Sequence, residues 1–305
     1  MNALEQLSDS LAAAVQSAGE GVVRVEGRRR IPSSGIVWSA DGLVVTAHHT
    51  IDRRSEVQVG LPDGKATAAK VIGRDPATDL AVLRLSTAGG RVLKRIDEGQ
   101  AKVGHLALAL GRPGASIQST LGVVSALEGG WRSPLGGHIE HYLQSDVVMY
   151  PGFSGGPLID AWGRVVGMNT SALLRGIALA IPVATIERVS QALVEHGRIR
   201  RGFLGVGVQP ARLPQPMEDR SGQSTGLLVA SVEGGSPAER AGVMLGDVLL
   251  TLGGERLAGM EDLLAALGGD VMDRATPLEI LRGGTRTTLT VTVGERPAST
   301  LCHSA

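Results

Sequence analysis

The stretch that decides the fold is PGFSGGPLID, at residues 151–160. It places Ser154 in a glycine-rich turn before a short apolar run, which is the pattern of a loop that leads into a strand. Glycine adopts backbone conformations that other residues avoid, so the N–H groups of Gly152 and Ser154 can converge on one point. Convergent N–H donors stabilise the negative charge that develops on a carbonyl oxygen during acyl transfer. A run of this kind is also common in ordinary loops, so its partners elsewhere in the chain must decide.

A serine becomes a useful nucleophile only beside a base. The segment TAHHTI at 46–51 offers His48 and His49 after an apolar strand, and DLAVL at 79–83 offers Asp79. Taken alone, each histidine is typical of a packed residue and the aspartate of a cap. Together they give the order His, Asp, Ser, with the first two in one set of strands and the serine in another. That is the order of chymotrypsin-like serine peptidases.

Two sets of short β-branched runs surround these segments, with glycine, proline and aspartate between them. Strands at this close spacing predict barrels or sandwiches. A helix at 183–196 closes the second set, and Gly197 supplies its C-terminal stop. The predicted strands are 22–26, 34–39, 43–47, 57–61 and 80–85 in the first set, and 106–110, 119–127, 142–148, 157–160, 164–170 and 177–182 in the second.

The composition excludes several classes of protein. Thirty basic residues balance 30 acidic ones and aromatic residues are only 2%, so a nucleic-acid interface has neither charge nor stacking groups. No stretch approaches the ~20 apolar residues of a membrane helix. Cys302 is the single cysteine, which excludes an intrachain disulfide. Glycine, at 43 residues, has no G-X-Y period and indicates many turns.

The first 19 residues predict an amphipathic helix rather than a signal peptide, because they lack a basic start. Leu4, Leu7 and Leu11 recur at helical spacing, and Asn2 with Glu5 resembles a capping box. From Arg200 onward the pattern alternates strands and helices in a compact β-α-β-α-β-β unit. Residues 298–305 read as a loose tail.

Six segments in order resemble the trypsin-fold protease domain of the HtrA (DegP/DegQ-like) serine proteases. The third unit, with RGFLGVGV, GSPAERAGVMLGDVLLTLGG and the EDLL helix, resembles the PDZ domain that follows in that family. The resemblance implies a mainly β chain with a trypsin-like double six-stranded β-barrel at 20–198 and an α+β PDZ domain at 199–297. The six segments are TAHHTI, DPATDLAVLRL, LGVVSAL, QSDVVMYPGFSGGPLID, GRVVGMNT and GIALAIP.

Family roles transfer by position within these motifs. The resemblance implies that His49, rather than His48, is the catalytic base, that Asp79 orients it, and that Ser154 is the nucleophile. Gly152 and Ser154 then supply the oxyanion N–H groups. Two departures bear on activity: Phe153 replaces the usual asparagine and puts a bulky ring at the mouth of the site, and the loop at 170–177 is shorter than in the family.

The resemblance also implies where substrates bind. The floor of the primary pocket falls six residues before the nucleophile, at Val148, with Ile177 as another wall, which predicts cleavage after small or medium aliphatic residues. The alternative is that both belong to the barrel core.

In the PDZ unit, Phe203, Leu204, Gly205 and Val206 form the implied carboxylate loop. The helix at 261–267 lines the groove with Leu264 and Leu267, unless these leucines are core residues. Extended C-terminal peptides are the implied ligands.

The function expected is ATP-independent proteolysis of unfolded or misfolded polypeptides, without cofactor or metal. The alternative is a PDZ adaptor or chaperone-like scaffold with a silent protease site. The family forms trimers through N-terminal segments, so a homo-oligomer is expected, with the Leu4/Leu7/Leu11 face as a substitute contact. The sequence as it stands predicts a cytoplasmic location, and a periplasmic one if the N-terminus is incomplete.

Overall fold

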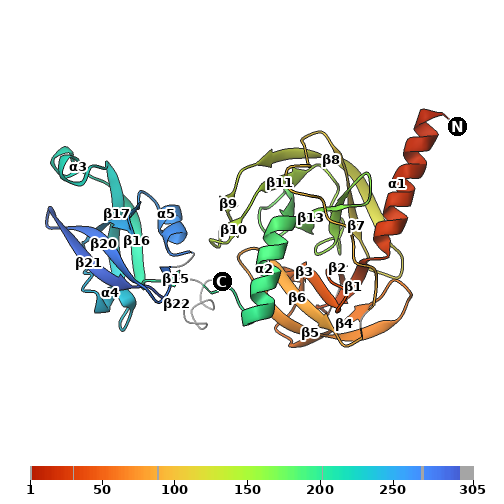
Figure 1. Ribbon diagram of the computed structural model, residues 1–305, viewed down its shortest axis with the longest axis horizontal. Helices are drawn as coiled ribbons and strands as arrows, with labels where there is room; N and C mark the ends of the chain where they lie inside the picture. Colours follow the sequence, from red (N-terminus) through yellow and green to blue (C-terminus); the bar gives the residue numbers. More distant parts are fainter. Residues whose placement is uncertain (1, 30, 88, 201, 269–270, 296–305) are drawn as a thin grey trace. The chain divides into compact units, whose positions relative to one another are not determined.

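The computed structural model describes residues 2–29, 31–87, 89–200, 202–268 and 271–295 (Figure 1). The chain divides into two units, Met1–Ile199 and Arg200–Ala305, each with its own hydrophobic core. The predicted tail at 298–305, with Cys302, lies outside the described residues.

The first unit contains two closed six-stranded antiparallel barrels, which confirms the predicted double-barrel fold. The first barrel has the strand order β1-β2-β3-β6-β5-β4. Its fifth strand was missed in the sequence, because a lysine and three alanines obscure the alternation of apolar and polar residues in this segment. The strands are β1 Val22–Glu26, β2 Ser33–Val37, β3 Leu43–Ala47, β4 Glu56–Gly60, β5 Ala66–Asp75 and β6 Leu80–Leu85.

The second barrel has the order β11-β14-β13-β12-β7-β8, and all six of its strands were expected from the sequence. A short hairpin of β9 and β10 extends from it. The strands are β7 Leu106–Gly111, β8 Gln118–Glu128, β9 Trp131–Arg132, β10 His138–Ile139, β11 Tyr142–Ser145, β12 Pro157–Asp160, β13 Val165–Thr170 and β14 Ala178–Pro182.

Three packed regions hold the first unit together. Each barrel has its own apolar interior, and a third cluster fills the space between them. The helix α2, Val183–His196, packs on β5 and β6 of one barrel and on β13 and β14 of the other (Figure 1). Its buried stripe of Ile186, Val189 and Leu193 joins the third cluster, so α2 fixes the two barrels against each other.

The N-terminal helix α1, Ala3–Gly19, has the predicted capping box: Asn2 Oδ1 accepts from the Glu5 N–H, and the Glu5 carboxylate accepts from the Asn2 N–H. Only its C-terminal part docks, through Ala14 and Ala18. Leu4 is 76% exposed, so the first two turns extend from the barrel without apolar contacts (Figure 1). Among the described residues no helix is long and apolar enough to cross a membrane.

The second unit is built on one antiparallel sheet in the order β16-β17-β18-β20-β21, with β19 on β18, a small β15–β22 pair and three short helices. The short helix α3 was not predicted from the sequence. The elements are β15 Gly202–Phe203, β16 Val206–Arg212, α3 Gln215–Ser221, β17 Thr225–Val232, α4 Pro237–Arg240, β18 Val248–Leu252, β19 Glu255–Arg256, α5 Met260–Ala266, β20 Ala275–Arg282, β21 Thr285–Thr292 and β22 Gly294–Glu295.

Candidate active site

An aspartate and a histidine from the first barrel form a hydrogen-bonded pair beside the junction between the barrels. His49 lies in the 3₁₀ turn His48–Thr50 that follows β3, and Asp79 precedes β6, the neighbour of β3 in the sheet. His49 Nδ1 lies 2.7 Å from Asp79 Oδ2, and the His49 backbone N–H donates to Asp79 Oδ1 at 2.8 Å. The carboxylate is 3% exposed, whereas the imidazole is 24% exposed. Asp79 therefore fixes the ring and leaves its other nitrogen accessible.

The Asp79 backbone is held in an uncommon conformation. Its φ of +56° lies in the left-handed region, which residues other than glycine adopt at a cost of about 1–3 kcal/mol. Thr170 at the end of β13, in the other barrel, donates its hydroxyl to Asp79 Oδ2. The Asp79 carbonyl accepts from the His48 N–H at 2.9 Å. These contacts from both barrels keep the carboxylate under the imidazole.

The neighbouring histidine has a different environment. His48 Nδ1 is buried and has no hydrogen-bond partner among the described residues. Burial lowers the pKa of His48 below its ordinary value, although the negative charge of Asp79 opposes this effect. The structure thus pairs His49, and not His48, with Asp79, as the position in the motif implied.

Ser154 lies at the start of the turn before β12, and the glycines after it permit the second barrel to approach the first. A Cβ on Gly155, whose φ is +87°, would lie 2.2 Å from the Ser34 carbonyl oxygen. A Cβ on Gly156 would lie 2.1 Å from the Leu110 carbonyl oxygen. Any side chain at these two positions would push the Ser154 turn away from the barrel junction.

The N–H groups of Gly152 and Ser154 donate no hydrogen bond to any described residue. The carbonyls of the same residues are held by β2: the Ser34 hydroxyl donates to the Gly152 oxygen at 2.7 Å, and the Ser34 N–H donates to the Ser154 oxygen at 3.2 Å. The Arg112 N–H in turn donates to Ser34 Oγ at 2.7 Å. With its carbonyls fixed and its N–H groups free, this turn is preorganised to bind an oxyanion.

Ser154, Gly152 and His49 line one cleft of about 290 Å³. Within it, the Ser154 hydroxyl pairs with Ser171 Oγ at 3.1 Å and not with His49. Hydrogen bonds between nucleophile and base are often absent without substrate, and a hydroxyl changes rotamer readily. Sequence reasoning missed Ser171, along with Ser34 and Thr170, because small hydroxyl residues at the ends of strands and in turns carry no distinguishing pattern.

The expectation that Phe153 places its ring at the mouth of the site is wrong. The ring is fully buried in the interior of the second barrel, where it packs against Gly111 and meets Tyr150 edge-on at 5.8 Å. The Phe153 N–H donates to the Tyr150 carbonyl. The Phe153 side chain therefore anchors the oxyanion turn to the interior of the second barrel and does not obstruct the cleft.

The predicted primary-pocket residues do not line this cleft. Val148 is 54% exposed and Ile177 is half-buried. A pocket floor is enclosed, so this conformation does not support Val148 as a floor. A second cavity, about 210 Å³, lies on the Asp79 side of His49, with Leu135, Ala172 and Leu173 in its walls.

The segment predicted to be a carboxylate loop lies between β15 and β16 in the second unit. The N–H groups of Leu204 and Gly205 donate to no described residue, and Gly205 has a φ of +79°. Gly205 and Val206 border a cavity of about 370 Å³. Of the two predicted groove leucines, Leu264 is half-buried outside the core cluster. Leu267 is a core residue, so its assignment to an open groove is wrong.

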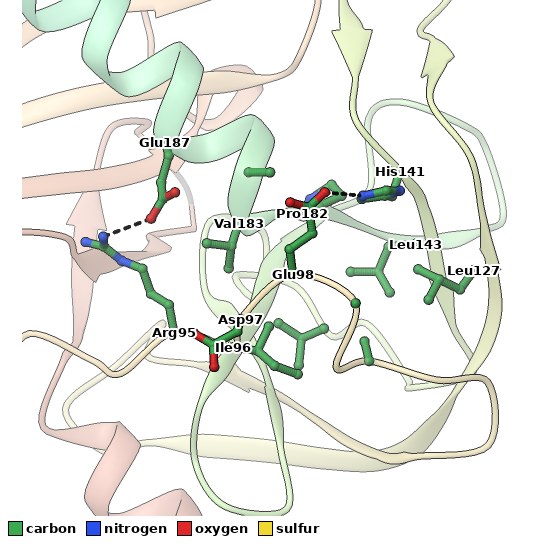
Figure 2. A pocket seen from close by; sticks show the side chains of 14 residues that line it. Arg95, Ile96, Asp97, Glu98, Leu127, His141, Leu143, Pro182, Val183 and Glu187 are labelled. Atoms are coloured by element: carbon green, nitrogen blue, oxygen red, sulfur yellow. Dashed lines mark hydrogen bonds and ion pairs between the residues drawn. The ribbon is translucent and has the colours of Figure 1, made fainter.

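A larger cavity, about 540 Å³, lies elsewhere in the first unit, beside the start of α2, and is lined in part by residues of the second barrel's apolar cluster (Figure 2). Its floor is apolar, with Ile96 and Leu143, and its rim carries the pairs Arg95–Glu187 and Glu98–His141. No serine, threonine or cysteine lines it, so it has no nucleophile for acyl transfer. In the described part of the chain, no cluster of His, Cys, Asp and Glu suits a metal ion.

Two six-stranded barrels, with His49, Gly152 and Ser154 lining one cleft and Asp79 bound to His49, have the arrangement of a trypsin-like peptidase domain. Residues 33–168 match the family model of the trypsin-like peptidase domain, and residues 202–293 match that of the PDZ domain. The chain belongs to the HtrA family, the DegP-like serine proteases with a PDZ domain.

Solved structures of the family resemble the whole described chain. The HtrA-type protease AlgW with a tripeptide is 31% identical, with a TM-score of 0.75 over 94% of this chain and 97% of that one. The serine endoprotease from Yersinia pestis is 26% identical, with a TM-score of 0.78 over 94% and 98% of the two chains.

Curated relatives match over a shorter share of their own length. The probable periplasmic DegP-like serine endoprotease of Chlamydia trachomatis is 35% identical over 283 residues, which is 90% of this chain and 56% of the relative. That of Ectopseudomonas mendocina is 35% identical over 270 residues, 87% and 56% of the two chains. The chain thus spans little more than half the length of these relatives.

Proposed function

We propose that the protein is an ATP-independent serine endopeptidase of the HtrA type. The observation that carries this proposal is the His49–Asp79 pair in the same cleft as Ser154, beside the two free N–H groups of the oxyanion turn. These are the groups that acyl transfer from a peptide needs. They come from distant segments, since His49 and Ser154 are 105 residues apart in the sequence.

The proposed reaction proceeds in two stages. Ser154 Oγ attacks the peptide carbonyl carbon while His49 Nε2 takes the hydroxyl proton, and the Gly152 and Ser154 N–H groups bind the resulting oxyanion. His49 gives the proton to the leaving nitrogen, and the C–N bond breaks. Water then attacks the acyl-enzyme and loses a proton to His49. His49 returns this proton to Ser154 Oγ as the ester C–O bond breaks, which releases the carboxylic acid and regenerates Ser154. Asp79 stays ionised and stabilises the imidazolium.

The substrates proposed are unfolded or misfolded polypeptides, cut after small or medium aliphatic residues. Val148 and Ile177 remain the proposed pocket residues, although they require an arrangement other than the open one seen here. We propose that the PDZ unit binds C-terminal peptides through the free N–H groups of Leu204 and Gly205, with Leu264 in the groove wall. AlgW with a decapeptide, a peptide-bound relative, supports peptides as ligands.

A periplasmic location is the proposal, because the similar DegP-like relatives are named periplasmic, and these names do not support the cytoplasmic expectation. A homo-oligomer, a trimer by family resemblance, is proposed with the exposed Leu4 and Leu7 face of α1 as a contact. Light scattering on the full chain and on a chain without residues 1–19 tests the oligomer. A trimer that persists after the truncation would exclude the helix as its contact.

The scaffold alternative is not favoured, because no member of the proposed triad is missing and Phe153 leaves the cleft open. Fluorophosphonate labelling of the intact protein, with digestion of unfolded casein alongside, tests the proposed function. We expect labelling and digestion in the wild type and in Ser125→Ala, an exposed serine on β8, and loss of both in Ser154→Ala. A folded wild type that neither labels nor digests casein, even with an activating C-terminal peptide, would refute the proposal.

A further inference from the structure

The loop between β1 and β2 forms one side of the cleft that contains Ser154. It follows Glu26 and carries the run Arg28–Arg29–Arg30, of which Arg30 lies outside the described residues, before Ile31 and Pro32. From sequence this run looks like a solvated turn. In the structure, however, Arg28, Ile31 and Pro32 line the cleft together with Gly152 and Ser154. A cationic residue is therefore part of the substrate channel.

The Arg28 side chain has no electrostatic partner in the described part of the chain. It makes no hydrogen bond or ion pair with a described residue, and Glu26, the nearest acid in sequence, is paired with Arg24 at 2.6 Å. None of the residues that line the cleft carries a carboxylate. A cation that no wall residue neutralises attracts an anionic group from a bound substrate.

The position of the loop indicates which part of a substrate it meets. On the first-barrel side of the cleft, His49 and Thr50 lie beside the end of the β1–β2 loop, because the Ser33 hydroxyl donates to Thr50 Oγ1 at 2.9 Å. His49 delivers the proton to the leaving nitrogen, so the chain beyond that nitrogen starts beside His49. The proposed primary-pocket residues Val148 and Ile177, which hold the acyl side, lie outside this cleft. The Arg28 side of the cleft therefore faces the leaving group.

We propose that Arg28 is a specificity-determining residue that selects aspartate or glutamate among the first residues after the scissile bond. This inference rests on the proposed function. Because Arg28 is exposed, its ion pair with the substrate is screened by water, and the expected selectivity is modest, roughly two- to fivefold. It adds to the aliphatic preference on the acyl side and acts on the opposite half of the substrate.

The test uses quenched-fluorescence peptides that differ only at the first, second or third residue after the scissile bond. Each position carries aspartate, asparagine or lysine, and every peptide is amidated so that a terminal carboxylate contributes nothing. The readout is the ratio of kcat/KM for the aspartate peptide to that for the asparagine peptide, at low ionic strength and in about 0.5 M salt. The variants are Arg28→Gln, Arg28→Glu and, as the matched control, Arg29→Gln, whose position does not line the cleft.

We expect the wild type and Arg29→Gln to favour aspartate at one position, with a ratio that falls toward one in salt. Arg28→Gln should lose the preference, and Arg28→Glu should favour lysine at the same position. An unchanged ratio in Arg28→Gln, or an equal loss in Arg29→Gln, overturns the inference. Fluorophosphonate labelling of each variant separates failure of the proposed function from failure of the inference. If the folded wild type is not labelled, the proposed function and the inference are both overturned. If the variants are labelled but the wild type and Arg28→Gln have equal aspartate-to-asparagine ratios, the inference alone is overturned.

Discussion

The two barrels contribute to the candidate site in different ways. The first supplies titratable side chains, His49 and Asp79, at the ends of neighbouring strands. The second supplies a hydroxyl and two backbone N–H groups, from Ser154 and Gly152 in a turn. In the proposed mechanism, one barrel therefore carries out proton transfer, and the other carries out bond formation and oxyanion binding.

Each barrel also positions the other's groups. Ser34 of the first barrel holds both carbonyls of the oxyanion turn, and Thr170 of the second holds Asp79. These crossing hydrogen bonds flank the apolar cluster between the barrels, which α2 completes. Each half of the candidate site is therefore completed by hydrogen bonds from the other barrel.

The largest effect should come from breaking the first barrel's contribution. Asp79→Asn keeps the shape of the side chain but places an amide beside His49, which favours the wrong imidazole tautomer. We expect kcat for a peptide substrate to fall about 10⁴-fold, with the fold retained. Asp63→Asn, an exposed carboxylate in a turn, is the control and should match the wild type. A loss of less than tenfold in Asp79→Asn would remove Asp79 from the proposed mechanism.

A smaller loss should follow from disturbing the second barrel's contribution. Gly152 has a φ of +93°, and a Cβ there would lie 2.6 Å from Pro113 Cβ and 2.8 Å from the Pro32 oxygen. Gly152→Ala must therefore shift the turn and misplace an oxyanion donor, at a cost of about 10²–10³-fold in kcat. Gly114→Ala is the matched control, because its added Cβ meets nothing. Wild-type kcat in Gly152→Ala would refute the assigned donor.

The sequence indicated the candidate reacting residues but not the residues that hold them in position. His49, Asp79 and Ser154 could be selected as candidates because their order and their motifs together resemble one family, although each segment alone is common. Ser34 is 118 residues from the Gly152 carbonyl that it binds, and Thr170 is 91 residues from Asp79. No local pattern encodes such pairs, since they depend on how two closed barrels dock. The ring of Phe153 was placed wrongly because the sequence around a glycine-rich turn does not show which way a side chain points.

Thr170 offers the finest test of how one barrel positions the other's residue. Thr170→Val removes the hydroxyl at nearly constant shape, while Asp79 keeps its two bonds to His49. We expect kcat to fall roughly tenfold, the equivalent of about 1–1.5 kcal/mol for one hydrogen bond. Thr170→Ser should restore most of the rate, because it restores the donor. If the valine and serine variants are equally impaired, packing and not the hydrogen bond is responsible.

The second unit extends the comparison, because its buried polar group serves stability and not chemistry. Asp247 is 2% exposed and accepts two hydrogen bonds from Arg282, at 2.7 and 2.8 Å, and one from the Met244 N–H at 2.8 Å. Burial raises the pKa of the Asp247 carboxyl, but these bonds and the positive charge of Arg282 outweigh it and hold the pKa below the ordinary 3.8. The carboxylate therefore stabilises the unit above the unfolded-state pKa, and this contribution is lost as the pH falls through the lower folded-state value.

Asp247→Asn should reduce the stability of the second unit by about 2–3 kcal/mol at neutral pH, because it leaves the Arg282 guanidinium, only 36% exposed, without its anion. The difference from the wild type should shrink as the pH falls below about 4, because the Asp247 carboxyl then protonates first in the unfolded state. Hydrogen exchange in β18 and β20 measures the stability of the second unit, with Glu261→Gln as an exposed control.

Trp38, Trp131 and Trp162, the only tryptophans, all lie in the first unit, so their fluorescence reports on that unit alone. The unfolding transition of the first unit and the rate of peptide hydrolysis should not change in Asp247→Asn, since both depend on the barrels. An equal loss of stability in the first and second units would show instead that the two units unfold together.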